Sequence, residues 1–121
     1  MAKSRTESYS VSPDLTAEAM GSGDMPVLAT PALVAMMENC AMKLAADELA
    51  DGDTTVGSFI STSHLKPSKV GAQISVTATL DAVEGRKLSF SITALDGDTL
   101  IAEASHVRFV VTRQRFLDKL G

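Results

Sequence analysis

The sequence predicts an α+β fold in which one long helix is wrapped by a curled antiparallel β-sheet. Two observations lead to this prediction. Residues 31–50 form the only long stretch with an apolar helical pattern. The long segments after it alternate apolar and polar residues with a period of two, which is typical of strands with one buried face. Because a lone helix and such a sheet each have one apolar surface, we expect them to pack together.

The chain before the helix is expected to contain little regular structure. Residues 1–6 are interpreted as a flexible polar tail that leads into a weak strand at residues 7–11. The segment 13–29 is expected to be irregular, with a helical turn at residues 16–20. It contains four residues that break long elements, namely Pro13, Gly21, Gly23 and Pro26. The whole chain, residues 1–121, has the size of one domain.

The central helix has a recognisable start at Thr30-Pro31. Threonine is a favoured N-cap, and proline at the first helical position loses no hydrogen bond there. We expect the helix to run to about Ala50 and to stop at Gly52. Its apolar face is formed by residues spaced three and four apart: Leu33, Met37, Cys40, Ala41 and Leu44.

Strands and turns account for most of the remaining chain. The predicted strands are residues 55–64, 70–80, 88–94 and 100–111. Turns are expected at Glu84-Gly85 and at Asp96-Gly97. Residues 113–120 are expected to form a short terminal helix. One helix followed by four antiparallel strands, with a first strand before it, indicates the hotdog arrangement, in which the sheet wraps the helix.

Composition excludes several classes of function. The chain carries 11 basic and 15 acidic residues, a net charge of −4, which argues against nucleic-acid or anionic-membrane partners. No apolar run approaches the roughly 20 residues that span a bilayer. The single cysteine, Cys40, cannot form a disulfide within the chain and is expected to be a small core residue. We therefore expect a cytoplasmic protein.

Glu38 is the most unusual residue of the helix. It lies in the stretch VLATPALVAMMENCA, residues 27–41, where most other residues are apolar or small. At about 100° per residue, Glu38 falls at the edge of the apolar stripe, roughly 20° from Ala45. It either reaches solvent or a cationic partner from that edge, or acts as a general base that orients water. The pattern alone leaves both interpretations open.

Three further side chains could take part in chemistry. Thr30 can serve as a helix cap, or it can bind a carbonyl oxygen beside the helix N-terminus. His64 ends a predicted strand, and alternation places it on the face that carries Val56, Ile60 and Thr62. By the same alternation, His106 shares a strand face with Ala102, Ala104 and Arg108. Each histidine can be a catalytic residue or an ordinary structural one.

Other common site motifs are missing from the sequence. Two histidines and one cysteine without close ligand spacing predict no metal site. There is no glycine-rich phosphate loop and no GxSxG nucleophile motif.

Four segments together resemble one protein family. They are ATPALVAMMENCA, TTVGSFISTSHLKPSKVG, AVEGRKLSFSITALDGD and IAEASHVRFVV. In this order they resemble the fluoroacetyl-CoA thioesterase-like branch of hotdog thioesterases, over about residues 7–118. The resemblance implies hydrolysis of a small or medium acyl-CoA to the acid and free CoA. It implies no cofactor other than the coenzyme A that belongs to the substrate.

The resemblance also implies roles for individual residues. Thr30, Glu38 and His64 match the catalytic set of the family. Glu38 would face an acyl pocket beside the helix, and Arg108 would support the site. Expected pocket residues are Gly57, Val34 and Met37, with Arg108 beside them. Cations for the CoA phosphates are assigned by position only: Lys66, Lys69, Arg86 and Lys87.

The resemblance implies a homodimer or higher even oligomer with sites at the subunit interface. A helix residue of one chain would therefore meet a strand residue of another.

One segment departs from the family pattern. The fluoroacetyl-specific enzyme closes its pocket with a lid that carries phenylalanines, whereas the matching segment here, AMGSGDMP at residues 19–26, has no aromatic residue. This departure argues against fluoroacetyl-CoA as the substrate. Met20 and Met25 are expected to line a more adaptable entrance.

Two other functions are compatible with the sequence. A hotdog hydratase or dehydratase would use a histidine and a carboxylate on a similar thioester, but HLKPSKVG only loosely matches the usual His-Phe-Pro-Gly pattern. A non-catalytic module that binds acyl-CoA or another apolar ligand would use Glu38 and His64 structurally. Release of free thiol distinguishes a thioesterase from both.

Overall fold

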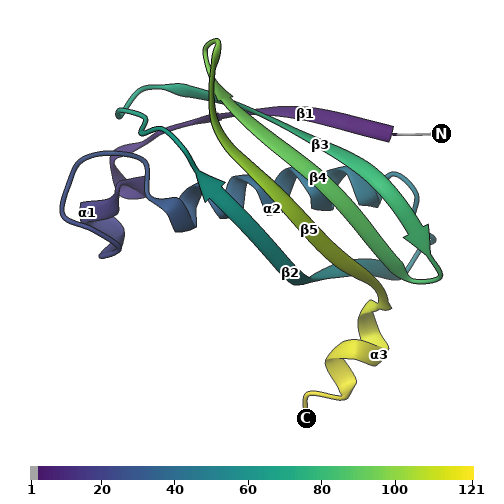
Figure 1. The fold of residues 1–121 in the computed structure, drawn as a ribbon. Helices are drawn as coiled ribbons and strands as arrows, with labels where there is room; N and C mark the ends of the chain where they lie inside the picture. The colour runs from purple at the N-terminus through teal and green to yellow at the C-terminus, as the bar shows by residue number, and fades with distance from the viewer. Residues whose placement is uncertain (1–2) are drawn as a thin grey trace.

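A five-stranded antiparallel sheet and one long helix dominate the computed structural model, which describes residues 3–121 (Figure 1). The order of the strands in the sheet is β1-β3-β4-β5-β2, so β1 and β2 are its edges. The strands are β1 (Lys3–Ser10), β2 (Asp53–His64), β3 (Gln73–Glu84), β4 (Lys87–Asp96) and β5 (Thr99–Thr112). The helices are η1 (Pro13–Leu15), α1 (Ala17–Met20), α2 (Thr30–Ala46) and α3 (Arg113–Asp118).

Helix α2 lies along one face of the curved sheet and buries the predicted apolar stripe (Figure 1). The buried helix residues are Ala32, Leu33, Met36, Met37, Cys40, Ala41, Leu44 and Ala45. They pack against inward residues of the sheet, including Ile74, Val76, Phe90 and Ile92. Burial of such side chains contributes about 1.5–3 kcal/mol each, so this single interface forms the core. The predicted helix and the hotdog arrangement are confirmed.

The ends of α2 differ from the prediction. The helix ends at Ala46, four residues before the expected end, and a turn leads to Gly52, whose φ is 86°. The N-cap position is Ala29, and Thr30 is the first helical residue. The Thr30 hydroxyl therefore does not cap the helix, and its hydrogen-bond partner lies elsewhere.

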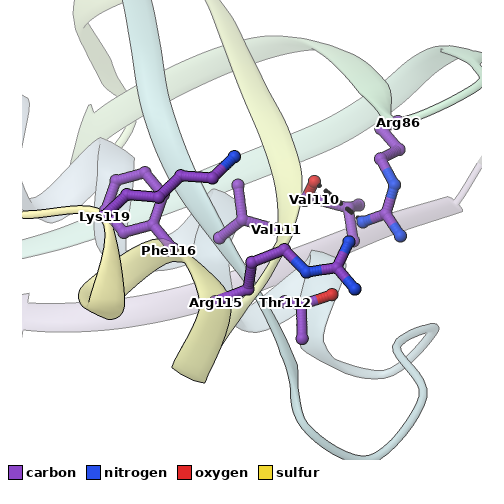
Figure 2. Close-up of a pocket in the computed structure, with 7 residues that line it drawn as sticks. All are labelled: Arg86, Val110, Val111, Thr112, Arg115, Phe116 and Lys119. Atoms are coloured by element: carbon purple, nitrogen blue, oxygen red, sulfur yellow. Dashed lines mark hydrogen bonds between the residues drawn. The ribbon is translucent and has the colours of Figure 1, made fainter.

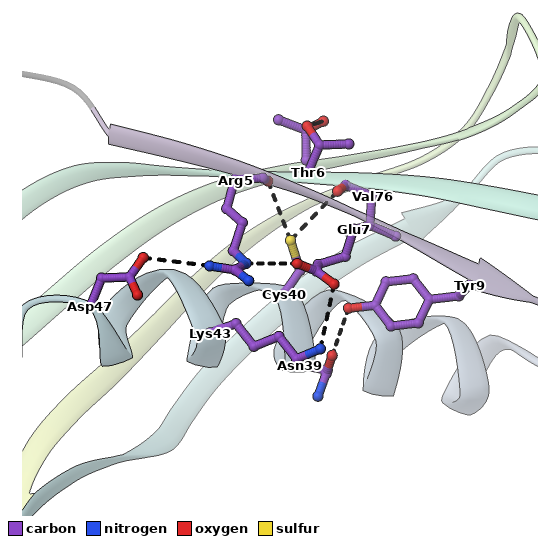
Figure 3. Close-up of polar contacts among 10 residues, drawn as sticks. Arg5, Thr6, Glu7, Tyr9, Asn39, Cys40, Lys43, Asp47 and Val76 are labelled. Carbon is purple, nitrogen blue, oxygen red and sulfur yellow. Dashed lines mark hydrogen bonds and ion pairs between the residues drawn. The ribbon is translucent and has the colours of Figure 1, made fainter.

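The predicted flexible tail at residues 1–6 is wrong for the part that the structure describes. Strand β1 begins at Lys3 and pairs with β3 along its whole length. Its helix-facing side carries charged residues that pair with α2 (Figure 3). Arg5 Nε donates to Glu7 at 2.7 Å, and Lys43 Nζ lies 3.4 Å from the same carboxylate. Because these polar groups satisfy one another, the strand needs no apolar inner face.

Cys40 is buried and Tyr9 is half-buried between β1 and α2 (Figure 3). Tyr9 Oη donates to Asn39 Oδ1 at 2.7 Å, and burial raises the pKa of Tyr9 to about 12. The Cys40 thiol donates to the carbonyl of Arg5 at 3.3 Å, and burial raises its pKa. A buried thiol with a raised pKa is a poor nucleophile, so Cys40 is a core residue.

A β-bulge interrupts β2 between Gly57 and Phe59 and changes which residues face α2. The extra residue shifts the alternation by one position. Before the bulge Thr55 and Gly57 face inward, and after it the even-numbered residues do so, His64 among them. The expectation that Val56 shares a face with His64 is therefore wrong.

The remaining elements follow the prediction closely. Gly85 and Gly97 have φ values of 63° and 60°, which suits glycine in the two hairpin turns. Strand β3 starts at Gln73 rather than at residue 70. The expected helical turn appears as α1, with the Thr16 hydroxyl accepting from the Ala19 amide. No helix within residues 3–121 is long and apolar enough to cross a membrane.

Candidate active site

Thr30 and His64 meet where the start of α2 approaches the end of β2. Thr30 Oγ1 and His64 Nδ1 form a hydrogen bond of 2.8 Å. They are 34 residues apart in sequence, so the fold itself brings them together. The positive end of the helix dipole lies at the same place, which favours a carbonyl oxygen that develops negative charge.

A cleft opens directly beside this pair. It has a volume of about 390 Å³, and both Thr30 and His64 line it. Its other walls come from α1, from the loop before α2 and from the segment after β2, which contribute Ser22, Val27, Leu28, Leu65 and Pro67 among others. Met20 and Met25, which were expected at the entrance, are exposed and do not line this cleft. Ser22 does so in their place.

His64 has one ring nitrogen without a partner. Its Nε2 atom and the Thr62 hydroxyl are buried, and neither has a hydrogen-bond partner within residues 3–121. A buried polar atom left unpaired costs about 1–3 kcal/mol, which a ligand or a second chain could remove. Burial lowers the pKa of His64, partly opposed by a backbone hydrogen bond to Lys66. The imidazole is therefore neutral at pH 7 and able to exchange a proton.

Glu38 lies in a second group of residues, farther along α2. A Cβ atom built on Gly57 would lie 2.9 Å from Glu38 Oε2, 3.3 Å from an Arg108 guanidinium nitrogen and 3.4 Å from the His106 ring. Gly57 thus leaves room that any other residue would fill. The Glu38 carboxylate, which is half-buried, reaches the inner face of β2 beside a cationic group.

Arg108 is held in this group by a network that the sequence did not reveal. Its Nε donates to Thr55 Oγ1 at 2.8 Å, and a second nitrogen donates to the Thr55 carbonyl at 3.1 Å. A third lies 3.3 Å from His106 Nε2. The alternation of His106 with Arg108 indicated their shared face. Thr55 could have been found as the residue two positions before Gly57 on the same face.

Burial sets the protonation of this network. Burial lowers the pKa of Arg108, and the negative charge of Glu38 raises it by a smaller amount. Burial also lowers the pKa of His106. His106 Nδ1 lies 2.7 Å from the Phe59 carbonyl and donates to it, while Nε2 accepts from Arg108. Both ring nitrogens are therefore committed in the neutral imidazole.

We expect the protein to lose stability as the pH falls from 7 to 5. The folded-state pKa values of His106 and His64 lie below the ordinary value of 6.5. As the pH falls, the unfolded chain therefore binds protons before the folded protein does. The contribution of these histidines to the free energy of unfolding is present above pH 6.5 and is lost below it. Urea unfolding at a fixed protein concentration measures this change.

The control for this prediction is His106→Gln, which cannot titrate. Its free energy of unfolding should fall less between pH 7 and pH 5 than that of the unmodified protein. A decline of equal size in both proteins would contradict the role given to His106.

The structure separates Glu38 from Thr30 and His64 within one chain. Eight residues of helix place Thr30 about 12 Å from Glu38 along the axis of α2. Seven residues of strand place Gly57, which touches Glu38, about 20 Å from His64. One chain therefore holds two separate groups of candidate residues, Thr30–His64 and Glu38–Gly57, which we call half-sites.

The other predicted binding residues have mixed positions. Val34 is half-buried, whereas Met37 has no exposed surface, so within one chain it has none free for an acyl group. Lys66 and Lys69 follow β2, whereas Arg86 and Lys87 lie at the β3–β4 turn. These two connections are at opposite ends of the sheet (Figure 1), so one chain does not gather the four cations. No cluster of acidic, histidine or cysteine side chains within residues 3–121 could hold a metal ion.

Comparison with protein families gives a match over most of the chain. The family described as fluoroacetyl-CoA-specific thioesterase matches residues 11–114 of this chain. The fluoroacetyl-CoA thioesterase of Streptantibioticus cattleyicolor is 34% identical over 94 residues, which cover 78% of this chain and 68% of that protein.

Solved structures give the same result. A fluoroacetyl-CoA thioesterase superposes with a TM-score of 0.92 at 30% identity, covering 98% of this chain and 93% of the other. A variant of it in complex with acetyl-CoA gives 0.93 at 28% identity, with coverage of 98% and 94%. A hot-dog-like protein from Thermanaerovibrio acidaminovorans, at 24% identity, gives 0.89 with coverage of 98% and 88%. That last likeness concerns the fold alone.

Proposed function

The chain belongs to the family of fluoroacetyl-CoA-specific thioesterases, which are hotdog-fold thioester hydrolases, and we propose that it hydrolyses acyl-CoA at a site completed by a second copy of itself. The observation that carries the proposal is the Thr30–His64 hydrogen bond beside a cleft, with Glu38 held apart in the same chain. Each copy then supplies half of the catalytic set.

The edge of the sheet offers the means of pairing. Within residues 3–121, strand β2 has a neighbour on one side only, where it pairs with β5. A two-fold axis at Ser61 would set β2 antiparallel to β2 of a second copy, and the extra residue of the bulge, Ser58, keeps opposed residues on the same face. That register places His64 of one copy opposite Gly57 of the other, beside Glu38. The unpaired Thr62 and His64 atoms lie on the same strand.

Each residue then has a role in the hydrolysis. Glu38 takes a proton from water, whose oxygen attacks the thioester carbon. Thr30 and the N-terminus of α2 stabilise the negative charge that develops on the carbonyl oxygen. The carbon–sulfur bond breaks, the proton that Glu38 took from water passes to Nε2 of the neutral His64, and His64 transfers it to the CoA thiolate. The products are the free acid and CoA. Arg108 acts as a positioning residue through its charge, which lies beside the Glu38 carboxylate.

The substrate that we propose is a small or medium acyl-CoA. One related structure is a complex with acetyl-CoA, and another is a complex with fluoroacetate and CoA. The segment corresponding to the lid lacks aromatic residues, and Ser22 lines the cleft. We therefore expect acyl groups other than fluoroacetyl to be accepted.

Release of free thiol from a panel of acyl-CoAs tests this function. The panel runs from acetyl to long-chain and aryl groups and includes fluoroacetyl-CoA. We expect turnover that peaks at one small or medium acyl group. Binding without turnover of any member would contradict the hydrolase and support a ligand-binding module. A change in enoyl absorbance without thiol release would support a hydratase.

A further inference from the structure

A second cleft lies at the C-terminal end of the chain, away from Thr30 and His64. It has a volume of about 230 Å³ and is formed by α3, the end of β5 and the β3–β4 turn (Figure 2). Three cationic side chains line it, namely Arg86, Arg115 and Lys119. The ring of Phe116, which is 38% exposed, forms part of the wall.

Ion pairs among residues 3–121 leave the cations of this cleft unneutralised. No acidic side chain lines the cleft, and none of the three cations makes an ion pair with another residue of the described range 3–121. Arg115 belongs to α3, and Lys119 is its C-cap residue, so two like charges lie close together at the end of the chain. In a chain of net charge −4, this arrangement favours an anionic ligand.

Arg86 is positioned in advance of any ligand. Its Nη1 donates to the Val110 carbonyl at 3.1 Å, and its own carbonyl accepts from the Val110 amide at 2.9 Å. Figure 2 shows the guanidinium groups of Arg86 and Arg115 on one side of Val111, with Lys119 and Phe116 on the other. A fixed guanidinium loses less conformational entropy when it binds a phosphate.

The cleft lies at a suitable distance from the Glu38 half-site. Arg108, which lies beside Glu38, and Thr112, which lines the cleft, are four residues apart on β5. That spacing corresponds to about 13 Å along the strand. The extended pantetheine arm of CoA spans such a distance between its thioester and its phosphorylated nucleotide.

We propose that this cleft binds the nucleotide end of CoA. Arg86, Arg115 and Lys119 hold its phosphate groups, and Phe116 offers a ring face to the adenine. This inference rests on the proposed thioesterase function, and it adds Arg115, Phe116 and Lys119 to the substrate contacts. It also assigns Arg86 to this cleft, whereas Lys66 and Lys69 of the same chain follow β2 and lie outside it.

Two substrates and one matched pair of variants test the proposal in turnover. In Arg115→Gln, KM for the best acyl-CoA of the panel should rise about tenfold while kcat changes little. KM for the same acyl group on pantetheine, which lacks the nucleotide, should stay unchanged. Arg113→Gln is the control, because it removes the same charge from the same helix and Arg113 lines a different hollow. Equal effects of the two variants, or equal effects on the two substrates, would overturn the proposal.

A binding measurement keeps the test independent of turnover. Calorimetry with adenosine 3′,5′-bisphosphate should show binding that weakens about tenfold in Arg115→Gln and not in Arg113→Gln. No binding to the unmodified protein would overturn the proposal, and so would equally tight binding of inorganic phosphate, which lacks the adenine. If no acyl-CoA is hydrolysed, the proposed function fails, and this measurement still decides what the cleft binds.

Discussion

Replacing His64 by alanine is expected to lower kcat for acyl-CoA hydrolysis by roughly 10²–10⁴-fold, the usual contribution of a general acid or base. His64 Nδ1 is bonded to Thr30 at 2.8 Å, and its Nε2 has no partner within residues 3–121. The ring is thus oriented and free to exchange a proton with the leaving thiolate. Thiol release under saturating substrate measures the change.

Variants of Thr30 provide the control for His64. Thr30→Ser keeps the hydroxyl that bonds to the imidazole and should keep most of the activity. Thr30→Val has nearly the same shape but removes that bond, and it should lose activity. Circular dichroism and the unfolding midpoint should show that all three variants fold. Full activity in folded His64→Ala would contradict its assigned role.

Replacing Glu38 by glutamine is expected to have an effect of similar size, roughly 10²–10⁴-fold on kcat. Glutamine matches the shape of glutamate but cannot accept the proton of water. It also removes the negative charge beside the buried Arg108 guanidinium, so we expect a small loss of stability as well. Steady-state hydrolysis and urea unfolding measure the two effects separately.

Glu48→Gln is the matched control for this change. The Glu48 carboxylate lies 2.6 Å from Lys3 Nζ, and its side chain is 49% exposed, so it lies outside the proposed site. Its loss should leave kcat unchanged, because exposed ion pairs contribute little. Equal activity of Glu38→Gln and Glu48→Gln would contradict the catalytic role of Glu38.

Local patterns predicted the elements that have a uniform inner face. The spacing of Leu33, Met37 and Leu44 predicted the buried side of α2, and the alternation at residues 88–94 predicted β4. These patterns succeed because each element buries one apolar surface, and its period follows from its own geometry.

Interactions between distant residues explain what the patterns missed. The inner side of β1 carries Arg5 and Glu7, and its pairing with Lys43 of α2 cannot be read from residues 3–10 alone. The bulge in β2 adds one residue and reverses the inward face, which simple alternation cannot reveal.

The candidate site shows the same limit. Thr30 has the local preference of an N-cap, but its hydroxyl bonds to a histidine 34 residues away. The set Thr30, Glu38 and His64 came from the family resemblance. The resemblance also implied that two chains share a site, and the fold adds that Thr30 and His64 lie together while Glu38 lies apart from them.

Mixed dimers test most directly whether two chains share one site. Glu38→Gln and His64→Ala chains are each expected to be inactive alone. After unfolding and refolding as an equal mixture, half of the dimers contain one chain of each kind. Each such dimer has one site with both Glu38 and His64 intact, so the mixture should recover about a quarter of the unmodified activity. No recovery, with mixed dimers demonstrated by mass spectrometry, would contradict the shared site and place all catalytic groups within one chain.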